Sequence, residues 1–397
     1  LLSSWLIWTF LAHNREVKKV AFVKDDAAQR YLLITCSHDS VKVWTLSPGA
    51  DDTVSLSEEN EIKGWRNGVQ DFDVTADGKI AAIVSVDSTL HQITLPADDH
   101  SVASREVFDT GFMEIWFLCI VPNQSEYIST RYSGSLIALD MTGKVTKTAP
   151  FNGVKQISAL ACVCIVHISP DGKSVAVANN EGIVTIVDSA NLASKFYFEA
   201  HALKVRAINF SPDSKHVLTG SDDKTVKLYE ILGSKAQHVS TFCGHRNYIT
   251  AVQFDRSYDG QRFASCSNDS SVIIWNAQST QPLYMFQNLH EGVVTSVSFS
   301  FDNQFLASVG EDRTICISRV DDGTRQVVGK DSELTQDNEP QAQEYSNNIY
   351  DSEEIHGYSA TLFDSHYSTG PQEEEEDELL VRARRDLEAA SDDEKIS

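Results

Sequence analysis

The chain has 397 residues, of which 41% are hydrophobic and 23% are charged, and its formal net charge is −24. A chain of this length and apolar content can bury a large core, in one large domain or in two ordinary ones. A protein this negative is repelled by the phosphate backbone of a nucleic acid. We therefore expect no direct nucleic-acid partner.

The cysteines and the apolar start of the chain argue against two further classes of protein. None of the seven cysteines forms a Cys-x-x-Cys pair, and most lie in strand-like runs. We therefore expect buried, reduced thiols in an intracellular protein rather than a disulfide framework. Residues 1–11 are too few to span a bilayer, and they lack the basic start and cleavage site of a signal peptide. No membrane partner is expected.

A unit of short strand-like runs recurs along the chain and is clearest between His245 and Trp275. There, residues 249–254, 263–269 and 272–275 alternate apolar with polar or small residues, which is the periodicity of strands. Seven units align on one position each, and neighbouring positions lie 42 to 49 residues apart. These positions are Trp44, Ile93, Leu139, Val187, Tyr229, Trp275 and Ser318.

The units share a His, a Ser or Thr run, an acidic turn and an aromatic residue, in that order. This order and period match the WD-repeat signature. A single four-stranded sheet cannot bury both of its faces, whereas sheets arranged radially cover one another and leave only short edges. The sequence therefore predicts an all-β, seven-bladed WD-repeat β-propeller.

The recurring polar residues are interpreted as a structural hydrogen-bond network within each blade. The complete set is His245, Ser265, Asp269 and Trp275, and a second set is His201, Thr219 and Asp223 with Tyr229 in the place of Trp. A Ser-His-Asp hydrolase triad is built once, whereas this set recurs at fixed spacing. The repeat histidines lie one to a blade and cannot converge on one metal ion. We predict a protein that is not an enzyme and that has no cofactor and no metal.

The two ends of the chain lead to different predictions. The last unit stops after its third strand, so residues 5–11 are expected to supply its outermost strand and to close the ring. This places the propeller at residues 5–320. Residues 321–397 hold 22 acidic and 6 basic residues, a net of −16, which leaves −8 for the rest. They are predicted to form an acidic, largely disordered tail.

The fourth unit is irregular, because residues 154–157 and 162–168 both read as its inner strand. The second run is followed by a Ser-Pro-Asp-Gly turn, so it is predicted to be the strand, with an insertion before it.

A partner-binding surface is predicted at the start of the inner strands, three and five residues after the repeat His. Tyr, Trp and Arg are the residue types that anchor interfaces. The candidates are Trp116, Lys204, Arg206 and Tyr248, with Trp65, in the His place of the second unit, at their flank. The alternative interpretation places Trp116 in the core and the basic residues in a solvated rim.

Several segments together resemble the WD-repeat subunit of the superkiller (Ski) complex, which is also a component of the Paf transcription-elongation complex. They are ISPDGK (168–173), EGIVTIVD (181–188), HALKVR (201–206), FSPDS (210–214) and SDDKTVKLY (221–229), with SVKVW (40–44) and GVQDFDV (68–74). The likeness covers about residues 12–320, and that family also ends its propeller near the third strand of the last unit.

This resemblance implies a non-enzymatic adaptor found in the nucleus and the cytoplasm, monomeric outside its complexes. Its partners would be the tetratricopeptide-repeat scaffold and the helicase of the superkiller complex, which feeds messenger RNA to the exosome, and the subunits of the Paf complex. The alternatives are a substrate receptor of a ubiquitin ligase or a histone-binding propeller. A fold assigns no function by itself, so the first hypothesis depends on the resemblance.

Overall fold

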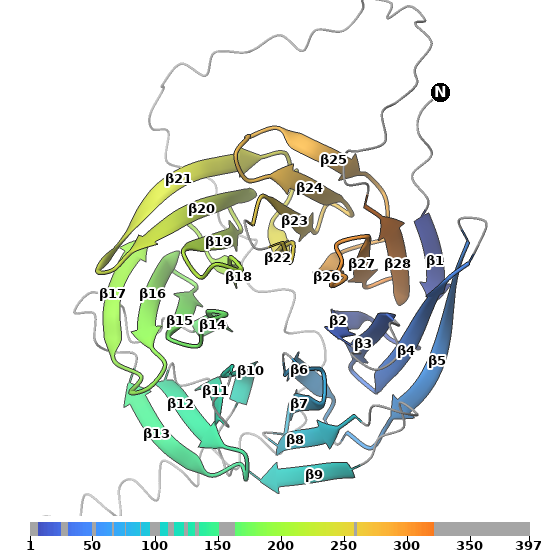
Figure 1. Ribbon diagram of the computed structural model, residues 1–397, viewed down its shortest axis with the longest axis horizontal. Coiled ribbons are helices and arrows are strands. Elements are labelled where there is room, and N and C mark those ends of the chain that lie inside the picture. The colour runs from blue at the N-terminus through green and yellow to red at the C-terminus, as the bar shows by residue number, and fades with distance from the viewer. Residues whose placement is uncertain are drawn as a thin grey trace, which may run out of the picture. The chain divides into compact units, whose positions relative to one another are not determined.

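In a computed structural model, the described part of the chain forms seven four-stranded antiparallel sheets around a central axis (Figure 1). The described residues are 7–320 without 25–30, 50–52, 66, 76, 88, 96–103, 110–114, 123–125, 132–134, 151–162 and 258–259. They contain strands, turns and loops but no helix. The molecule is a seven-bladed β-propeller, as the repeat pattern predicts.

Six blades are made of consecutive strands. The first contains β2 (Val17–Lys24), β3 (Tyr31–Ser37), β4 (Val41–Pro48) and β5 (Val54–Ile62). The second contains β6 (Val69–Val74), β7 (Ile80–Ser85), β8 (Thr89–Thr94) and β9 (Ser104–Asp109). The third contains β10 (Ile115–Ile120), β11 (Glu126–Arg131), β12 (Ser135–Asp140) and β13 (Val145–Pro150).

The fourth blade contains β14 (Val163–Ile168), β15 (Ser174–Asn179), β16 (Ile183–Asp188) and β17 (Ser194–Glu199). The fifth contains β18 (Val205–Phe210), β19 (His216–Ser221), β20 (Thr225–Leu232) and β21 (Lys235–Cys243). The sixth contains β22 (Ile249–Phe254), β23 (Arg262–Ser267), β24 (Val272–Asn276) and β25 (Pro282–Phe286). The seven aligned sequence positions all lie on the third strand of a blade.

The seventh blade joins the two ends of the propeller. It contains β26 (Val294–Phe299), β27 (Phe305–Gly310) and β28 (Thr314–Arg319), and its fourth strand is β1 (Ile7–Leu11). β1 pairs antiparallel with β28, from Ile7 opposite Ser318 to Leu11 opposite Thr314. The start of the chain thus supplies the fourth strand of the last blade. Trp5 and Leu6 lie outside the described residues.

Burial follows the position of each strand in its blade. The second strands are buried along almost their whole length, as in β27, because neighbouring blades cover both of their faces. The outer strands alternate between exposed and partly buried residues, as in β17, because one face meets solvent. The hydrophobic clusters lie between adjacent blades, so each blade is stabilised by its neighbours. One cluster packs Trp44 of the first blade against Ile317 of the seventh.

The structure also bears on the irregular unit and on the cysteines. β14 is the inner strand of the fourth blade, as predicted, and the competing residues 154–157 lie outside the described part. All five cysteines with described side chains are free; Cys243 is exposed and the other four are buried.

No helix of the described part is long and apolar enough to span a membrane. The predicted tail, residues 321–397, also falls outside the described residues and stays a prediction.

Candidate functional site

The inner strands surround a central channel with a volume of about 1090 Å³. The second residue of an inner strand faces this channel near its mouth in several blades: Lys18, Gln70, Arg206, Thr250 and Thr295 line it. Of the predicted binding residues, Arg206 lines the channel, and Lys204 and Tyr248 lie just before the inner strands of the fifth and sixth blades. The described members Lys204, Arg206 and Tyr248 are called the rim patch here.

In the rim patch, Arg206 of the fifth blade stacks on the ring of Tyr248, which precedes the inner strand of the sixth blade. Its guanidinium carbon lies 4.4 Å from the centre of the Tyr248 ring. The same guanidinium forms a two-point ion pair with Asp222, with 3.1 Å between Nη2 and Oδ2. Asp222 itself is placed by its backbone N–H, which donates to the carbonyl of Lys204 at 3.0 Å. The Arg–Tyr stack is therefore held rigid and spans the fifth and sixth blades.

The electrostatics of the rim patch differ from those expected of a basic patch. Asp222 pairs with Arg206, so that guanidinium does not act as a free positive charge. Burial raises the pKa of Tyr248, and the nearby carboxylate of Glu311 adds to the rise. The pKa of Glu311 is raised by burial and by the negative charge of Glu16. The mouth thus offers an arginine paired with a carboxylate and stacked on one tyrosine ring, beside the acidic residues Glu311 and Glu16.

The structure describes the side chain of only one of the two predicted tryptophans. Trp65 is partly buried and packs against the hydrophobic cluster between the first two blades. Its ring N–H donates to the Ile62 carbonyl at 3.0 Å, its ring lies 4.6 Å from that of His91, and Arg105 lies 4.4 Å above it. Trp65 therefore takes the structural place of the repeat His. Trp116 lies on β10, and its side chain is outside the described part.

The recurring polar residues meet inside the blades. His245 contacts Asp269 at 3.1 Å and Ser265 at 2.8 Å, and the Trp275 ring N–H donates to the same Ser265 hydroxyl at 2.8 Å. In the fifth blade, His201 lies 2.7 Å from Asp223 and 2.9 Å from Thr219. Tyr229 takes the place of Trp275 in this blade. Its hydroxyl donates to the Ala200 carbonyl at 2.8 Å, whereas the Trp275 N–H donates to a serine hydroxyl.

The first and seventh blades contain variants of this network. In the seventh, His290 lies 3.0 Å from Asp312 and 2.9 Å from Ser308. In the first, His13 contacts Ser40 at 3.0 Å and Thr35 at 2.8 Å. Asp39 comes one position late for the repeat, which is why Ser40 replaces it as the partner of His13.

The buried histidines of the propeller make stability depend on pH in two opposite ways. Burial lowers the pKa of His13 and of His167 to about 4. Burial also acts against a charged His290, but the hydrogen bonds and charges of Asp312 and Cys316 together outweigh it and raise the pKa of His290 to about 9. The folded protein therefore binds fewer protons than the unfolded chain between pH 4 and 6.5, and more between 6.5 and 9.

We therefore expect the free energy of unfolding to be highest near pH 6.5 and to fall at lower and at higher pH. Each histidine can contribute at most about 1.4 kcal/mol to this fall for each unit by which its pKa is shifted. Urea unfolding at pH 4.5, 6.5 and 8.5 measures this. The His290→Asn variant should lose the decline between pH 6.5 and 8.5 and keep the acid decline. An alkaline decline that persists in that variant would contradict the assignment.

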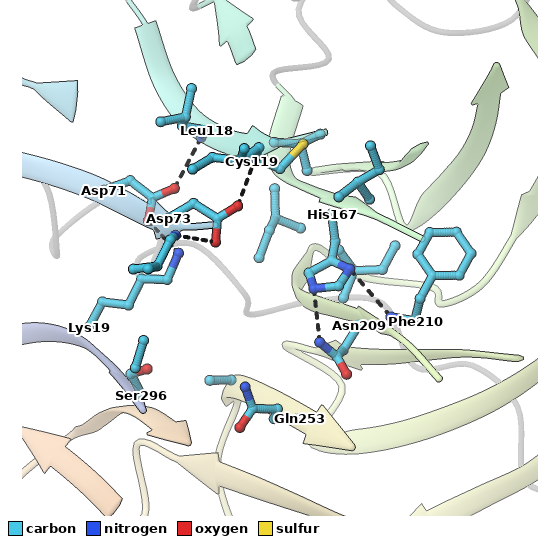
Figure 2. Close-up of a pocket in the computed structure, with 18 of the residues that line it drawn as sticks. Lys19, Asp71, Asp73, Leu118, Cys119, His167, Asn209, Phe210, Gln253 and Ser296 are labelled. Carbon is cyan, nitrogen blue, oxygen red and sulfur yellow. Dashed lines mark hydrogen bonds and ion pairs between the residues drawn. The ribbon is translucent and has the colours of Figure 1, made fainter. Parts of the chain in front are cut away.

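The described residues bring together no group of three or more His, Cys, Asp or Glu side chains that could hold a metal. The channel wall instead carries charged and polar side chains bonded to neighbouring inner strands (Figure 2). Lys19, for example, donates to Asp71 at 2.8 Å, and the Asp71 carboxylate accepts from the Leu118 N–H at 3.1 Å. Sequence reasoning missed these wall residues and Asp222. The available signal was a charged residue at the third position of the first two inner strands, Lys19 in β2 and Asp71 in β6.

The repeat profile described as "WD domain, G-beta repeat" matches residues 193–230, 236–276 and 281–317. The molecule is thus a seven-bladed β-propeller that contains WD40 repeats. Its matched repeats form the outer part of the fourth blade and the fifth to seventh blades, where the His–Asp contacts of the fifth to seventh blades are found.

Several curated proteins are similar to part of this WD40 propeller. Protein hir-1 of Neurospora crassa is 25% identical over 181 residues, or 38% of this chain and 17% of that protein. The B-type cell cycle switch protein ccs52A of Medicago truncatula is 32% identical over 157 residues, or 39% of this chain and 32% of that protein. Protein FIZZY-RELATED 2 of Arabidopsis thaliana is 30% identical over 177 residues, or 44% of this chain and 34% of that protein. The WD40 propeller thus spans at most about a third of the length of these relatives.

Proposed function

We propose that this protein is a non-enzymatic scaffold that binds a partner peptide at the mouth of its channel, across the fifth and sixth blades. The single observation that carries the proposal is the stack of Arg206 on Tyr248, fixed by Asp222. Arginine and tyrosine are enriched among the residues that dominate binding energy. A side chain already held in place loses little conformational entropy when a partner binds.

At a finer level, we propose an adaptor role in the superkiller complex and in the Paf complex, in the cytoplasm and the nucleus. The support is the resemblance of residues 12–320 to the WD-repeat subunit of those complexes. The partners would be a tetratricopeptide-repeat scaffold and a helicase in the first complex, and the other Paf subunits in the second.

A second candidate function is supported by the names of the similar proteins. One relative that is 32% identical is called a cell cycle switch protein, so a regulatory role in the cell cycle is the alternative. A substrate receptor of a ubiquitin ligase would be one form of that role, and a histone-binding propeller is a further alternative. Because 224 curated proteins match this chain, repeat similarity alone does not choose among these roles.

The double variant Trp116→Ala, Tyr248→Ala is expected to weaken binding to the tetratricopeptide scaffold by about 30-fold or more, because truncating even one interface anchor costs about 2 kcal/mol or more. The thermal melt should stay nearly unchanged, since Tyr248 is only partly buried. Titration by isothermal calorimetry measures the affinity. Tyr197→Ala, an exposed residue on the outer strand β17, is the matched control and should bind normally. Unaltered binding by a folded double variant would contradict the site.

A further inference from the structure

Most inner strands are joined to the next blade by a hydrogen bond at the same place. The fifth residue of the strand accepts a bond from a backbone N–H of the next inner strand, and we call this bond the clamp. The clamps are Asp73 with Ile120 at 2.8 Å, Asn209 with Phe254 at 3.0 Å, Gln253 with Phe299 at 2.8 Å, Ser298 with Phe22 at 3.1 Å, and His167 with Phe210 at 3.4 Å. Such bonds add to the apolar packing between blades.

The junction between the first two blades uses a different device. Ala21 stands at the clamp position of β2 and has no polar group. Two lysines replace the clamp, with Lys19 donating to the carbonyl of Phe72 at 2.6 Å and Lys18 to that of Val69 at 2.9 Å. Lys19 also pairs with Asp71. This junction is therefore also tied by polar contacts.

At the junction between the third and fourth blades, which we call the seam, the described side chains show neither device. Cys119 stands at the clamp position of β10 and Phe117 two residues before it. A phenyl ring accepts no conventional hydrogen bond, and a thiol sulfur is a weak acceptor. Burial raises the pKa of the Cys119 thiol well above its usual range, so the group stays a neutral thiol. In Figure 2, Cys119 lies on the channel wall between Asp73 and His167. Each of these two residues accepts a hydrogen bond from the next blade. Among the described residues, no side chain of β10 is bonded to β14.

A second observation points to the same two blades. Thr130 Oγ1 on β11, Asn179 Nδ2 on β15 and Thr185 Oγ1 on β16 are buried without a hydrogen-bond partner. Each such group destabilises its surroundings, because the bond to water that is lost on burial is not replaced. These three residues belong to the third and fourth blades, and one further such atom, Thr45 Oγ1, lies on β4 of the first blade. Both sides of the seam therefore contain unsatisfied groups.

We propose that the propeller opens first at the seam, and not at the junction where its two ends meet. That junction carries the full β1–β28 pairing, the Ser298 clamp and its own hydrophobic cluster. Opening at the seam would expose the backbone of β10 and β14. It would leave the rim patch intact, because Arg206, Asp222 and Tyr248 belong to the clamped fifth and sixth blades. Trp116, the other residue of the binding test, lies on β10 and would move with the seam.

Hydrogen exchange of the full chain, followed by mass spectrometry, tests the proposal. Protection factors in β10 and β14 are expected to be lower than those in β18, β22 and β26. Cys119→Ser places an oxygen acceptor where Ser298 provides one at another junction, with almost no change in volume. It should slow exchange in β10 and β14 by about two- to tenfold, the effect of one added hydrogen bond.

Ser298→Cys is the matched reciprocal variant. It should speed exchange in β26 and β2 by a similar factor, because it removes the clamp and keeps the shape of the side chain. Equal protection of all inner strands in the unaltered protein would overturn the proposal. So would a Cys119→Ser protein that melts cooperatively but exchanges at the original rate in β10 and β14. If Cys119→Ser does not fold, an unchanged rate in Ser298→Cys would count against the clamps.

Discussion

Replacing Trp275 with alanine is expected to lower the free energy of unfolding by about 3–5 kcal/mol, the range for large aromatic residues in cores. The side chain has 0% of its surface exposed. Its ring lies 5.5 Å from that of Phe242 and 6.2 Å from that of Phe263, and its N–H donates to Ser265. The variant therefore creates a cavity between two blades and also removes one hydrogen bond of the network. Equilibrium unfolding in urea measures the loss.

Two controls separate these causes. Trp275→Phe keeps most of the volume but loses the bond to Ser265, so it should cost less than Trp275→Ala. Tyr229→Phe, at the matching position of the fifth blade, removes only the hydroxyl that donates to Ala200 and should cost about 1 kcal/mol. If Trp275→Phe destabilised the protein as much as Trp275→Ala, the cavity would not be the main cause.

Removing residues 1–11 is expected to destabilise the propeller strongly and to make it self-associate. The deletion takes away β1, including Trp8 and Phe10, which pack on the cluster between the seventh and first blades. It also leaves the backbone groups of β28 as an unpaired edge, and such edges pair with other chains. The melting temperature and light scattering at increasing protein concentration measure the two effects.

Removing residues 1–6 is the matched control, because it shortens the same end and keeps β1 whole. This variant should melt close to the full chain and stay monodisperse. A stable, monodisperse protein without residues 1–11 would show that β1 does not close the ring in solution.

Repetition made the fold predictable from the sequence. Seven units share one period, and a ring of sheets is the arrangement that buries both faces of each. The closing strand was predictable for a similar reason, because the last unit lacked a fourth strand and the apolar segment before His13 had strand periodicity. The inner strand of the fourth blade was chosen correctly because a Ser-Pro-Asp-Gly turn follows it.

The site was less predictable, because its character depends on contacts between units. The sequence placed Arg206 and Tyr248 at the mouth but did not show that Asp222 neutralises the arginine. Trp65 was predicted to flank the surface, whereas its ring packs on His91 and the core. The clamps join strands about 45 residues apart, as Asn209 and Phe254 illustrate, and alignment of the units alone did not reveal them.

The measurement that most directly tests the central claim is recovery of partners from native lysate, identified by mass spectrometry. The baits are the full chain, a chain ending at residue 320 and the full chain carrying Tyr248→Ala with Trp116→Ala. We expect the first two baits to recover a tetratricopeptide-repeat scaffold with a helicase, and the third to lose them. Recovery of cullin-type ligase components or histones in their place would contradict the adaptor role. Loss of the scaffold on removal of residues 321–397 would contradict a binding site on the propeller.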